Sequence, residues 1–340
     1  VYLNDTGHST TQGVSRFDTI FYNKSSDTYT HPNKWFDGSS ITGFPIDVQS
    51  NDCGWNDLNL VKTGCGDMLL HINQACDTGG GWFRNYTHQY RNQSGTIKNW
   101  GFNQVIDPVN SDISHQEFMA PTDDMVLDDT IYLPISRDYG SWGHPGFNSY
   151  LLNSTDCGHT WYYQSNISED SSYDMTEVGI TYVGGNNFTI VTRVGKNESG
   201  DRFTTYQRVS EDRGFTWNPI QDIRDEVGFW HNPVLRNSWK FSGSDYYPIW
   251  MVGRYYTNEP TESNAVAEKY SIDSEWDYTV LDEECGDCGY GDFLQLSPDE
   301  FKVFNYVAGD DDIREYDVDS VDGVNIEGGV NIESGVNIGG

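Results

Sequence analysis

Two octapeptides in this chain share the pattern Ser-x-Asp-x-Gly-x-Thr-Trp: STDCGHTW at 154–161 and SEDRGFTW at 210–217. Their final tryptophans belong to a longer series, Trp35, Trp100, Trp161, Trp217 and Trp276, with spacings of 65, 61, 56 and 59 residues. Recurrence at such intervals is typical of repeat architectures, in which each unit buries its apolar face against its neighbours. The pattern therefore predicts an array of similar units.

The segments between the tryptophans consist of short β-branched and aromatic runs broken by Gly, Asn, Asp and Pro, which predicts strands and turns. In each unit an apolar run, a turn and a second apolar run predict a hairpin, at 57–72, 117–137, 177–193, 231–254 and 290–306. A third strand and the tryptophan turn follow. Four strands per unit predict an all-β fold, a β-propeller of five or six four-stranded blades over residues 1–316, closed by the N-terminal segment.

Residues 317–340 differ in kind, because valine recurs at 318, 324, 330 and 336 and isoleucine at 326, 332 and 338. A strict period of six with glycine at the corners predicts a short hexapeptide-repeat β stalk, which associates with copies from other chains. A flexible Gly-rich tail is the alternative.

Three aspartates at the start of this segment, Asp317, Asp319 and Asp322, have spacings that suit calcium, with Gly323 as a turn. In a chain this acidic, ordinary surface charge is the simpler explanation of these aspartates. No other feature of the sequence requires a cofactor.

The charge excludes one large class of function. The chain has 52 acidic and 20 basic residues, a net charge of −32, which is incompatible with binding nucleic acid through its phosphates. A folded chain this acidic suits a halophilic setting, because salt screens its self-repulsion. No apolar run is long enough to predict a membrane span.

Several features predict an extracellular protein, on a cell or virion surface. The chain opens on VYLND, as a processed secreted chain would. Eight Asn-x-Ser/Thr sequons precede residue 201: Asn4, Asn23, Asn85, Asn92, Asn153, Asn166, Asn187 and Asn197. Six cysteines are an even number that suits disulfides, although Cys285 and Cys288 also have the spacing of half a zinc site.

The two octapeptides match the Asp box, and the chain resembles the sialidase-like (BNR-repeat) propellers. The resemblance implies that each box forms the turn between the third and fourth strands of a blade. Its aspartate accepts backbone N–H bonds, its glycine takes positive φ and its tryptophan packs between blades. The matching residues are Ser154, Asp156, Gly158 and Trp161 in the first box and Ser210, Asp212, Gly214 and Trp217 in the second. Residues 269–278 resemble a decayed third copy.

Candidate site residues lie at the other end of the hairpins. In a blade, the first strand starts and the second ends on the same face, so residues at these positions converge around the channel. The first-strand starts are Asp57, Glu117, Glu177, His231 and Tyr290, and the second-strand ends are Arg137, Arg193 and Arg254. Three guanidinium groups in one register predict a clamp for a carboxylate, while pairing of each arginine with local carboxylates is the alternative.

The family resemblance assigns roles to these residues. It implies an arginine triad that holds a sugar carboxylate, Tyr290 as nucleophile and Glu177 as the base that assists it. The resemblance also implies an aspartate as acid/base, which is Asp57, Asp123 or Asp124 in this sequence, with Asp57 our candidate. If the chain instead resembles other glycosidase propellers, its Asp57 and Glu177 would act as base and acid. The remaining interpretation is that these residues only line the channel and have a structural role.

Three functions follow. The first is a secreted, glycosylated propeller that recognises a cell-surface glycan or glycoprotein, as the head of an oligomeric spike, tail fibre or filament, and forms homo-oligomers through the C-terminal repeats. The second is an active retaining sialidase-like hydrolase. The third is a purely structural subunit of an extracellular filament.

Overall fold

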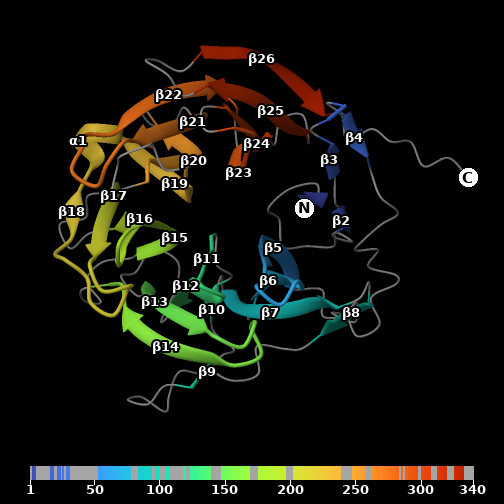
Figure 1. Cartoon of the computed structure of the whole chain (residues 1–340), viewed down its shortest axis with the longest axis vertical. Coiled ribbons are helices and arrows are strands. Elements are labelled where there is room, and N and C mark those ends of the chain that lie inside the picture. The colour runs from blue at the N-terminus through green and yellow to red at the C-terminus, as the bar shows by residue number, and fades with distance from the viewer. Residues whose placement is uncertain are drawn as a thin grey trace, which may run out of the picture. The chain divides into compact units, whose positions relative to one another are not determined.

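The computed structural model describes the parts of the chain on which all structural statements rest: residues 2–4, 16–18, 21–23, 25–26, 28–30, 53–77, 83–93, 96–99, 105–106, 118–119, 123–138, 147–168, 175–196, 202–238, 247–256, 262–282, 285, 288–297, 300–307, 312–319 and 325–332. The chain divides into two units, Val1–Asp174 and Met175–Gly340. Almost all regular structure is β-strand, in several four-stranded antiparallel sheets of the kind found in propeller blades (Figure 1). Among the described residues no helix could span a membrane.

The first unit contains two larger sheets, each named here after a candidate site residue. The Asp57 sheet has the order β5-β6-β7-β8, and the Arg137 sheet has the order β10-β12-β13-β14-β9, with β11 also paired to β12. Their strands are β5 (Cys53–Lys62), β6 (Met68–Asp77), β7 (Phe83–Gln93), β8 (Thr96–Asn99), β9 (Val105–Ile106), β10 (Phe118–Met119), β11 (Met125–Leu127), β12 (Thr130–Asp138), β13 (Phe147–Ser154) and β14 (Trp161–Asn166). Two short pairs precede them, β1 (Tyr2–Asn4) with β2 (Arg16–Asp18) and β3 (Phe21–Asn23) with β4 (Thr28–Thr30).

The second unit contains three four-stranded antiparallel sheets in chain order. The Glu177 sheet consists of β15 (Met175–Gly184), β16 (Asn187–Lys196), β17 (Arg202–Ser210) and β18 (Gln221–Asp222). After the single-turn helix α1 (Arg224–Val227), the His231 sheet consists of β19 (Phe229–Asn237), β20 (Ile249–Tyr256), β21 (Glu262–Lys269) and β22 (Asp277–Asp282). The Tyr290 sheet consists of β23 (Cys288–Gln295), β24 (Glu300–Val307), β25 (Asp312–Asp319) and β26 (Asn325–Ile332).

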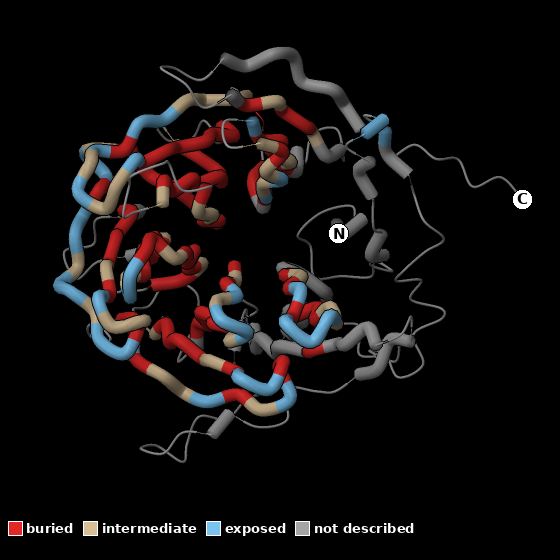
Figure 2. The backbone as a smooth tube through the Cα atoms, in the orientation of Figure 1, coloured by how far each residue is buried: buried red, intermediate tan, exposed pale blue. Residues whose placement is uncertain are grey.

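Apolar side chains between successive sheets hold the second unit together. One buried cluster, which includes Val191, Trp230 and Met251, joins the Glu177 sheet to the His231 sheet, and another, which includes Trp250, Val252 and Phe301, joins the His231 sheet to the Tyr290 sheet. Inner strands such as β15 and β20 are therefore buried on both faces, whereas the outer strands β18 and β22 are largely exposed or half-buried (Figure 2). Each fully buried tryptophan stabilises the fold by about 3 kcal/mol or more.

Both octapeptides form the turn after the third strand of their sheets, as the sequence predicts. The Ser154 hydroxyl donates to Asp156 Oδ1 at 2.8 Å, and the Gly158 N–H donates to the Ser154 hydroxyl oxygen at 2.8 Å. The second turn repeats these bonds from Ser210 to Asp212 and from Gly214 to Ser210, at 2.8 and 2.7 Å. Gly158 and Gly214 have φ of 81° and 84°, a region that favours glycine.

The C-terminal repeats are arranged differently from the sequence expectation. The predicted stalk begins at residue 317, but Asp317 and Asp319 end β25, and Asn325–Ile332 pair with β25 as the fourth strand of the Tyr290 sheet. This sheet therefore has four strands without a contribution from the N-terminal segment. Alternating Asn, Ile, Glu and Val side chains satisfy strand periodicity as well as they satisfy a stalk, which is why the sequence did not separate the two arrangements.

Candidate functional site

The first strands of four sheets share an irregularity close to the predicted site residues. In each, the pairing with the second strand shifts by one residue, which is the signature of a β-bulge. The bulged positions are Asp57 in β5, Glu177 in β15, Asn232 and Pro233 in β19, and Tyr290 and Gly291 in β23. Bulges re-aim side chains and are common beside functional sites, so this repeated device marks one end of each hairpin.

Glu177 occupies the bulge of β15 with a φ of 52°, a left-handed conformation that is unusual for glutamate. Its carboxylate accepts a hydrogen bond from Arg193 Nη1 at 2.8 Å and one from the Asn232 N–H at 3.1 Å. With the Asn232 amide turned to its favourable orientation, Nδ2 also donates to both carboxylate oxygens, at 3.0 and 2.8 Å. Glu177 is thus fixed as a hydrogen-bond acceptor between two sheets.

His231 lies near enough to Arg193 and Arg254 to be influenced by both of their charges. Its Cα is the register partner of Arg254, and its ring contacts Phe229 and Tyr256, with ring centroids 4.6 and 4.8 Å apart. Burial, followed by the positive charges of Arg193 and Arg254, lowers the pKa of His231 far below its ordinary value. The imidazole is therefore neutral at physiological pH. The charged groups near it are Arg193 and Arg254, each of which also faces a carboxylate, that of Glu177 or of Glu262.

Arg254 is held by two neighbours in the same unit. Its Nε donates to the carbonyl oxygen of Cys288, and its Nη1 lies 3.8 Å from Glu262 Oε1. The Tyr256 hydroxyl donates to the same Glu262 oxygen at 2.8 Å. Burial is the main cause that raises the pKa of Tyr256 to about 12, so its hydroxyl remains a donor. The Arg254 side chain is 9% exposed, which places the cation at the edge of the buried interior.

A row of polar residues crosses the His231 sheet at this level. Register pairing connects His231 to Arg254, Arg254 to Asn264, and Asn264 to Asp282, from the first strand to the fourth. Asp282 accepts hydrogen bonds from Arg314 Nη1 and, at 3.2 Å, from the Tyr316 hydroxyl of the Tyr290 sheet. The interface between these sheets is apolar at Trp250 and Val252 and becomes polar at this row.

The other predicted residues either lie in the first unit or have only their backbone described. Arg137 is in β12, paired with Phe118, and Asp57 is at the bulge of β5, so both belong to the first unit. Tyr290 is at the bulge of β23 in the same unit as Glu177, and its side chain lies outside the described residues, as does Glu117. Asp123 is buried and Asp124 half-buried, both in the first unit. The structure thus brings together Glu177, Arg193, His231 and Arg254.

The calcium and glycan attachment positions stay predictions. Asp317 Oδ1 accepts a hydrogen bond from Lys302 Nζ at 2.7 Å, and Asp322 lies outside the described residues. No three His, Cys, Asp or Glu side chains in the described ranges gather as a metal site. Among the sequons, Asn166 is exposed, and Asn153 and Asn187 are half-buried. The described ranges do not include Asn197, nor the side chains of Asn4, Asn23, Asn85 and Asn92.

Three residues of the candidate site were not predicted from the sequence: Asn232, Tyr256 and Glu262. Asn232 follows His231 directly, and its φ of 50° is a position that asparagine tolerates better than most residues. The Asn-Pro pair at 232–233 was the available signal, because it marks a local break in strand pairing. Tyr256 follows Arg254 by two residues on the same strand face, whereas nothing in the sequence points to Glu262.

No protein family model and no curated protein sequence matches the chain. Among solved structures, a protein of unknown function from Dyadobacter fermentans has 16% identity and a TM-score of 0.64, over 96% of this chain and 84% of that one. A Penicillium chrysogenum α-L-arabinanase complexed with arabinobiose has 13% identity and a TM-score of 0.51, over 77% of both chains. A B. megaterium levansucrase variant has 9% identity and a TM-score of 0.52, over 97% and 91%. At these identities the likeness shows the fold alone, that of a β-propeller.

Proposed function

We propose that this protein recognises a glycan, and that Arg193 and Arg254 bind an acidic group of that glycan beside His231. The observation that carries the proposal is the placement of two arginines on adjacent sheets: Arg193 is bonded to Glu177, which also accepts the Asn232 N–H of the next sheet, and Arg254 is the register partner of His231. The chain has only 20 basic residues against 52 acidic ones, so a local pair of arginines at the bulged end of two hairpins is a specific arrangement.

The chemistry of the pair suits a carboxylate. Guanidinium groups present planar sets of donors that match carboxylate geometry, and partial burial strengthens such charge-assisted bonds. Within the described residues, Arg193 uses Nη1 for Glu177, while its buried Nε–H meets no acceptor. The rings of Phe229 and Tyr256 supply apolar surface next to the charges.

The fold supports a sugar as the carrier of the acidic group. Two of the structures that share the fold are an arabinanase with bound arabinobiose and a levansucrase. Fold alone does not fix function, so the two arginines carry the proposal and the fold supports it only by analogy.

An affinity measurement tests the proposal. Immobilised neutral, carboxylated and sulfated oligosaccharides are offered to the wild type, to Arg193→Ala and to Arg254→Ala. We expect retention on the carboxylated set and a loss of at least about tenfold in affinity for each variant. Arg224→Ala, at an exposed position of α1, is the matched control and should bind as the wild type does. Equal binding by all four proteins would refute the proposal.

A second candidate, a retaining hydrolase, is favoured by one observation. Glu177 is held in a left-handed backbone conformation at a bulge, and non-glycine residues in such conformations cluster at active sites. Glu177 accepts hydrogen bonds from Arg193 and Asn232, an arrangement that suits a base acting on the Tyr290 hydroxyl of the same unit.

Turnover separates the two candidates. A hydrolase should release the fluorophore from an acidic-sugar glycoside, and Glu177→Gln and Tyr290→Phe should each lower kcat at least about a hundredfold. The binding function predicts no turnover by the wild type and unchanged retention by Tyr290→Phe.

The biological setting remains part of the proposal. The sequons, the disulfides and the acidic composition support a secreted head of a spike, tail fibre or surface filament at high salt. Association through residues 333–340, the repeats beyond β26, predicts a smaller mass by light scattering when they are deleted. An unchanged mass would leave the filament and spike settings without support.

A further inference from the structure

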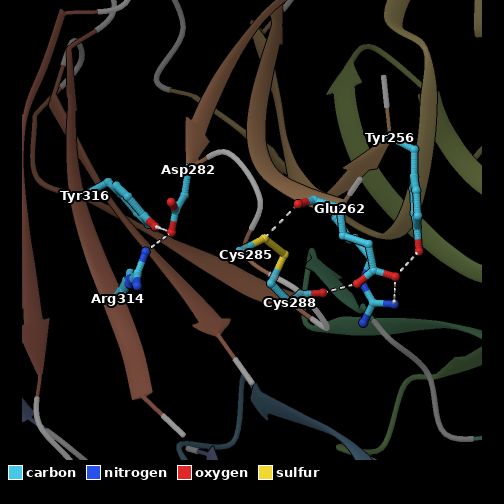
Figure 3. The surroundings of a disulfide bond; sticks show 8 residues. Tyr256, Glu262, Asp282, Cys285, Cys288, Arg314 and Tyr316 are labelled. Atoms are coloured by element: carbon cyan, nitrogen blue, oxygen red, sulfur yellow. Dashed lines mark hydrogen bonds and ion pairs between the residues drawn. A yellow bond between two sulfur atoms is a disulfide. The ribbon is translucent and has the colours of Figure 1, made fainter. Parts of the chain in front are cut away.

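A disulfide closes the link between the last two sheets of the second unit. β22 ends at Asp282 and β23 begins at Cys288, and Cys285 in the link is bonded to Cys288 (Figure 3). Both cysteines are buried, at 6% and 0% exposure. The bridge joins residues that are only three apart in the sequence, and its two cysteines contact the protein interior.

One side of this loop contacts Arg254. The Cys288 carbonyl oxygen accepts the Arg254 Nε–H, and the next residue, Gly289, has a φ of 114°. A Cβ at Gly289 would lie 3.0 Å from Arg254 Cβ and 3.3 Å from its backbone nitrogen. The start of β23 is therefore packed directly on Arg254, and glycine is required there for both conformation and space.

The other side of the loop contacts Glu262. The Cys285 N–H donates to the Glu262 carbonyl oxygen at 3.0 Å, and Cys285 Sγ lies 3.4 Å from the same oxygen. The Glu262 carboxylate faces Arg254 Nη1 and accepts the Tyr256 hydroxyl bond (Figure 3). Arg254 is thus held by Cys288, which is one residue of the bridge, and by Glu262. Glu262 in turn contacts Cys285, the other residue of the bridge.

We infer that the loop closed by Cys285 and Cys288 positions Arg254, and thereby sets the affinity of the proposed site for an acidic sugar. This inference rests on the proposed function. An arginine side chain has many rotamers, and fixing it before binding removes an entropy cost that the ligand would otherwise bear. Cys285, Cys288 and Glu262 act through Arg254 and are positioning residues.

General stabilisation of the fold explains this bridge poorly. The chain-entropy gain from a disulfide grows with the length of the loop that it closes. The bridge between Cys65 and Cys157, in the first unit, has a sequence separation of 92, against three for Cys285 and Cys288. The long bridge should therefore matter more for global stability, and the short bridge for local geometry.

The two bridges provide a matched experiment on the full chain. Cys285→Ala/Cys288→Ala is compared with Cys65→Ala/Cys157→Ala for melting temperature and for affinity towards two probes, glucuronic acid and N-acetylneuraminic acid. We expect the first variant to bind at least about tenfold more weakly with a small change in Tm. The second should lose more Tm and keep its affinity. A loss of affinity in both variants, in proportion to Tm, would overturn the inference.

A readout without ligand separates this inference from the proposed function. The Arg254 Nε–H resonance is followed by NMR, because its hydrogen bond to the Cys288 carbonyl oxygen is the contact that the bridge holds. Release of Arg254 should shift this resonance and speed its exchange with solvent in the Cys285→Ala/Cys288→Ala variant, even if the wild type binds neither probe. Glu262→Gln, which leaves the bridge intact, should shift affinity in the same direction. An unchanged Arg254 Nε–H resonance in both variants would refute the positioning role, whereas a wild type that binds no probe would refute only the proposed function.

Discussion

Asp156 and Asp212 organise two turns in the same way, each with one carboxylate. Asp212 accepts the Thr216 N–H at 2.8 Å, the Thr216 hydroxyl at 2.6 Å and the Ser210 hydroxyl at 2.8 Å. Burial alone would raise the pKa of Asp212, but these hydrogen bonds outweigh it and lower the pKa. All partners lie within six residues of one another, which explains why the sequence motif predicted this geometry.

Replacement of this carboxylate should cost stability. We expect Asp212→Ala to lower the free energy of unfolding by about 1–2 kcal/mol, because the turn loses the acceptor for its donors. The folded pKa is below the unfolded one, so the contribution is present at neutral pH and is lost as the pH falls below about 4. Denaturant unfolding at pH 7 checks this, with the exposed Asp225→Ala as control. An equal loss in both variants would contradict the assignment.

His71 also makes stability fall on acidification, but the cause is burial of a neutral ring rather than hydrogen bonding to a charged group. Burial lowers its pKa to about 4, although a hydrogen bond with Gln89 opposes the shift. Below pH 6.5 His71 takes up a proton in the unfolded chain but stays neutral in the folded chain. The free energy of unfolding therefore falls with acidification down to about pH 4.

The contribution of His71 can be measured by comparing how much the free energy of unfolding changes with pH in the wild type and in a His71 variant. Between pH 7 and 5 this group should remove about 2 kcal/mol from the free energy of unfolding. The His71→Gln variant cannot take up this proton. Its free energy of unfolding should therefore fall by about 2 kcal/mol less than that of the wild type between the same two pH values. Urea unfolding at both pH values, at constant salt, gives the comparison. Parallel losses in the two proteins would show that His71 does not titrate in this way.

At the scale of the elements, a hydrogen bond between a tryptophan and a glutamine connects two sheets in each unit. Trp161 Nε1 donates to Gln89 Oε1 at 2.9 Å, and Trp276 Nε1 donates to Gln207 Oε1 at 3.0 Å. In each case the tryptophan follows the turn after a third strand, and the glutamine lies in the third strand of another sheet of the same unit. The tryptophan spacing was legible in the sequence, whereas the partner glutamine depends on how two sheets meet.

Loss of this connector should destabilise each unit by a similar amount. Trp276→Phe keeps an aromatic ring but removes the donor, which leaves the buried Gln207 oxygen without this bond, so we expect a loss of about 1–3 kcal/mol. Trp161→Phe should behave alike. A double-mutant cycle with Gln207→Leu checks the coupling by denaturant unfolding, and additive effects would show that the pair does not interact.

The sequence located the Glu177, Arg193, His231 and Arg254 positions because hairpin register is a local property. Strand periodicity and turn residues put an acidic or imidazole group opposite an arginine without any knowledge of tertiary structure. Glu262 was missed for a physical reason: it lies on a third strand, and its partners Arg254 and Tyr256 are reached only through sheet pairing. The fourth strand of the Tyr290 sheet was misassigned to the N-terminal segment because repeats suit strands and stalks alike.

At the scale of the whole molecule, the net charge of −32 governs the response to solvent. Self-repulsion among carboxylates disfavours the compact state, and salt shortens the range of that repulsion. Internal pairs such as Lys302 with Glu315 and Asp317 neutralise only a few of these charges.

Salt should therefore stabilise this protein. We expect Tm to rise steadily between about 0.05 and 1 M NaCl, over which the Debye length falls from more than 10 Å to about 3 Å. Differential scanning calorimetry at pH 7 measures the rise. A flat or falling Tm would show that surface repulsion is not a significant term.

The strand that completes the Tyr290 sheet has a near-duplicate in the same chain. Its sequence NIEGGVNI, at 325–332, recurs six residues later as NIESGVNI at 331–338. Two overlapping segments can therefore compete for one pairing edge, and glycine-rich strands specify register weakly. Removal of one repeat by a six-residue deletion would leave a complete octapeptide, so we expect wild-type Tm by calorimetry. In evolutionary terms this edge is buffered against changes in the number of repeats.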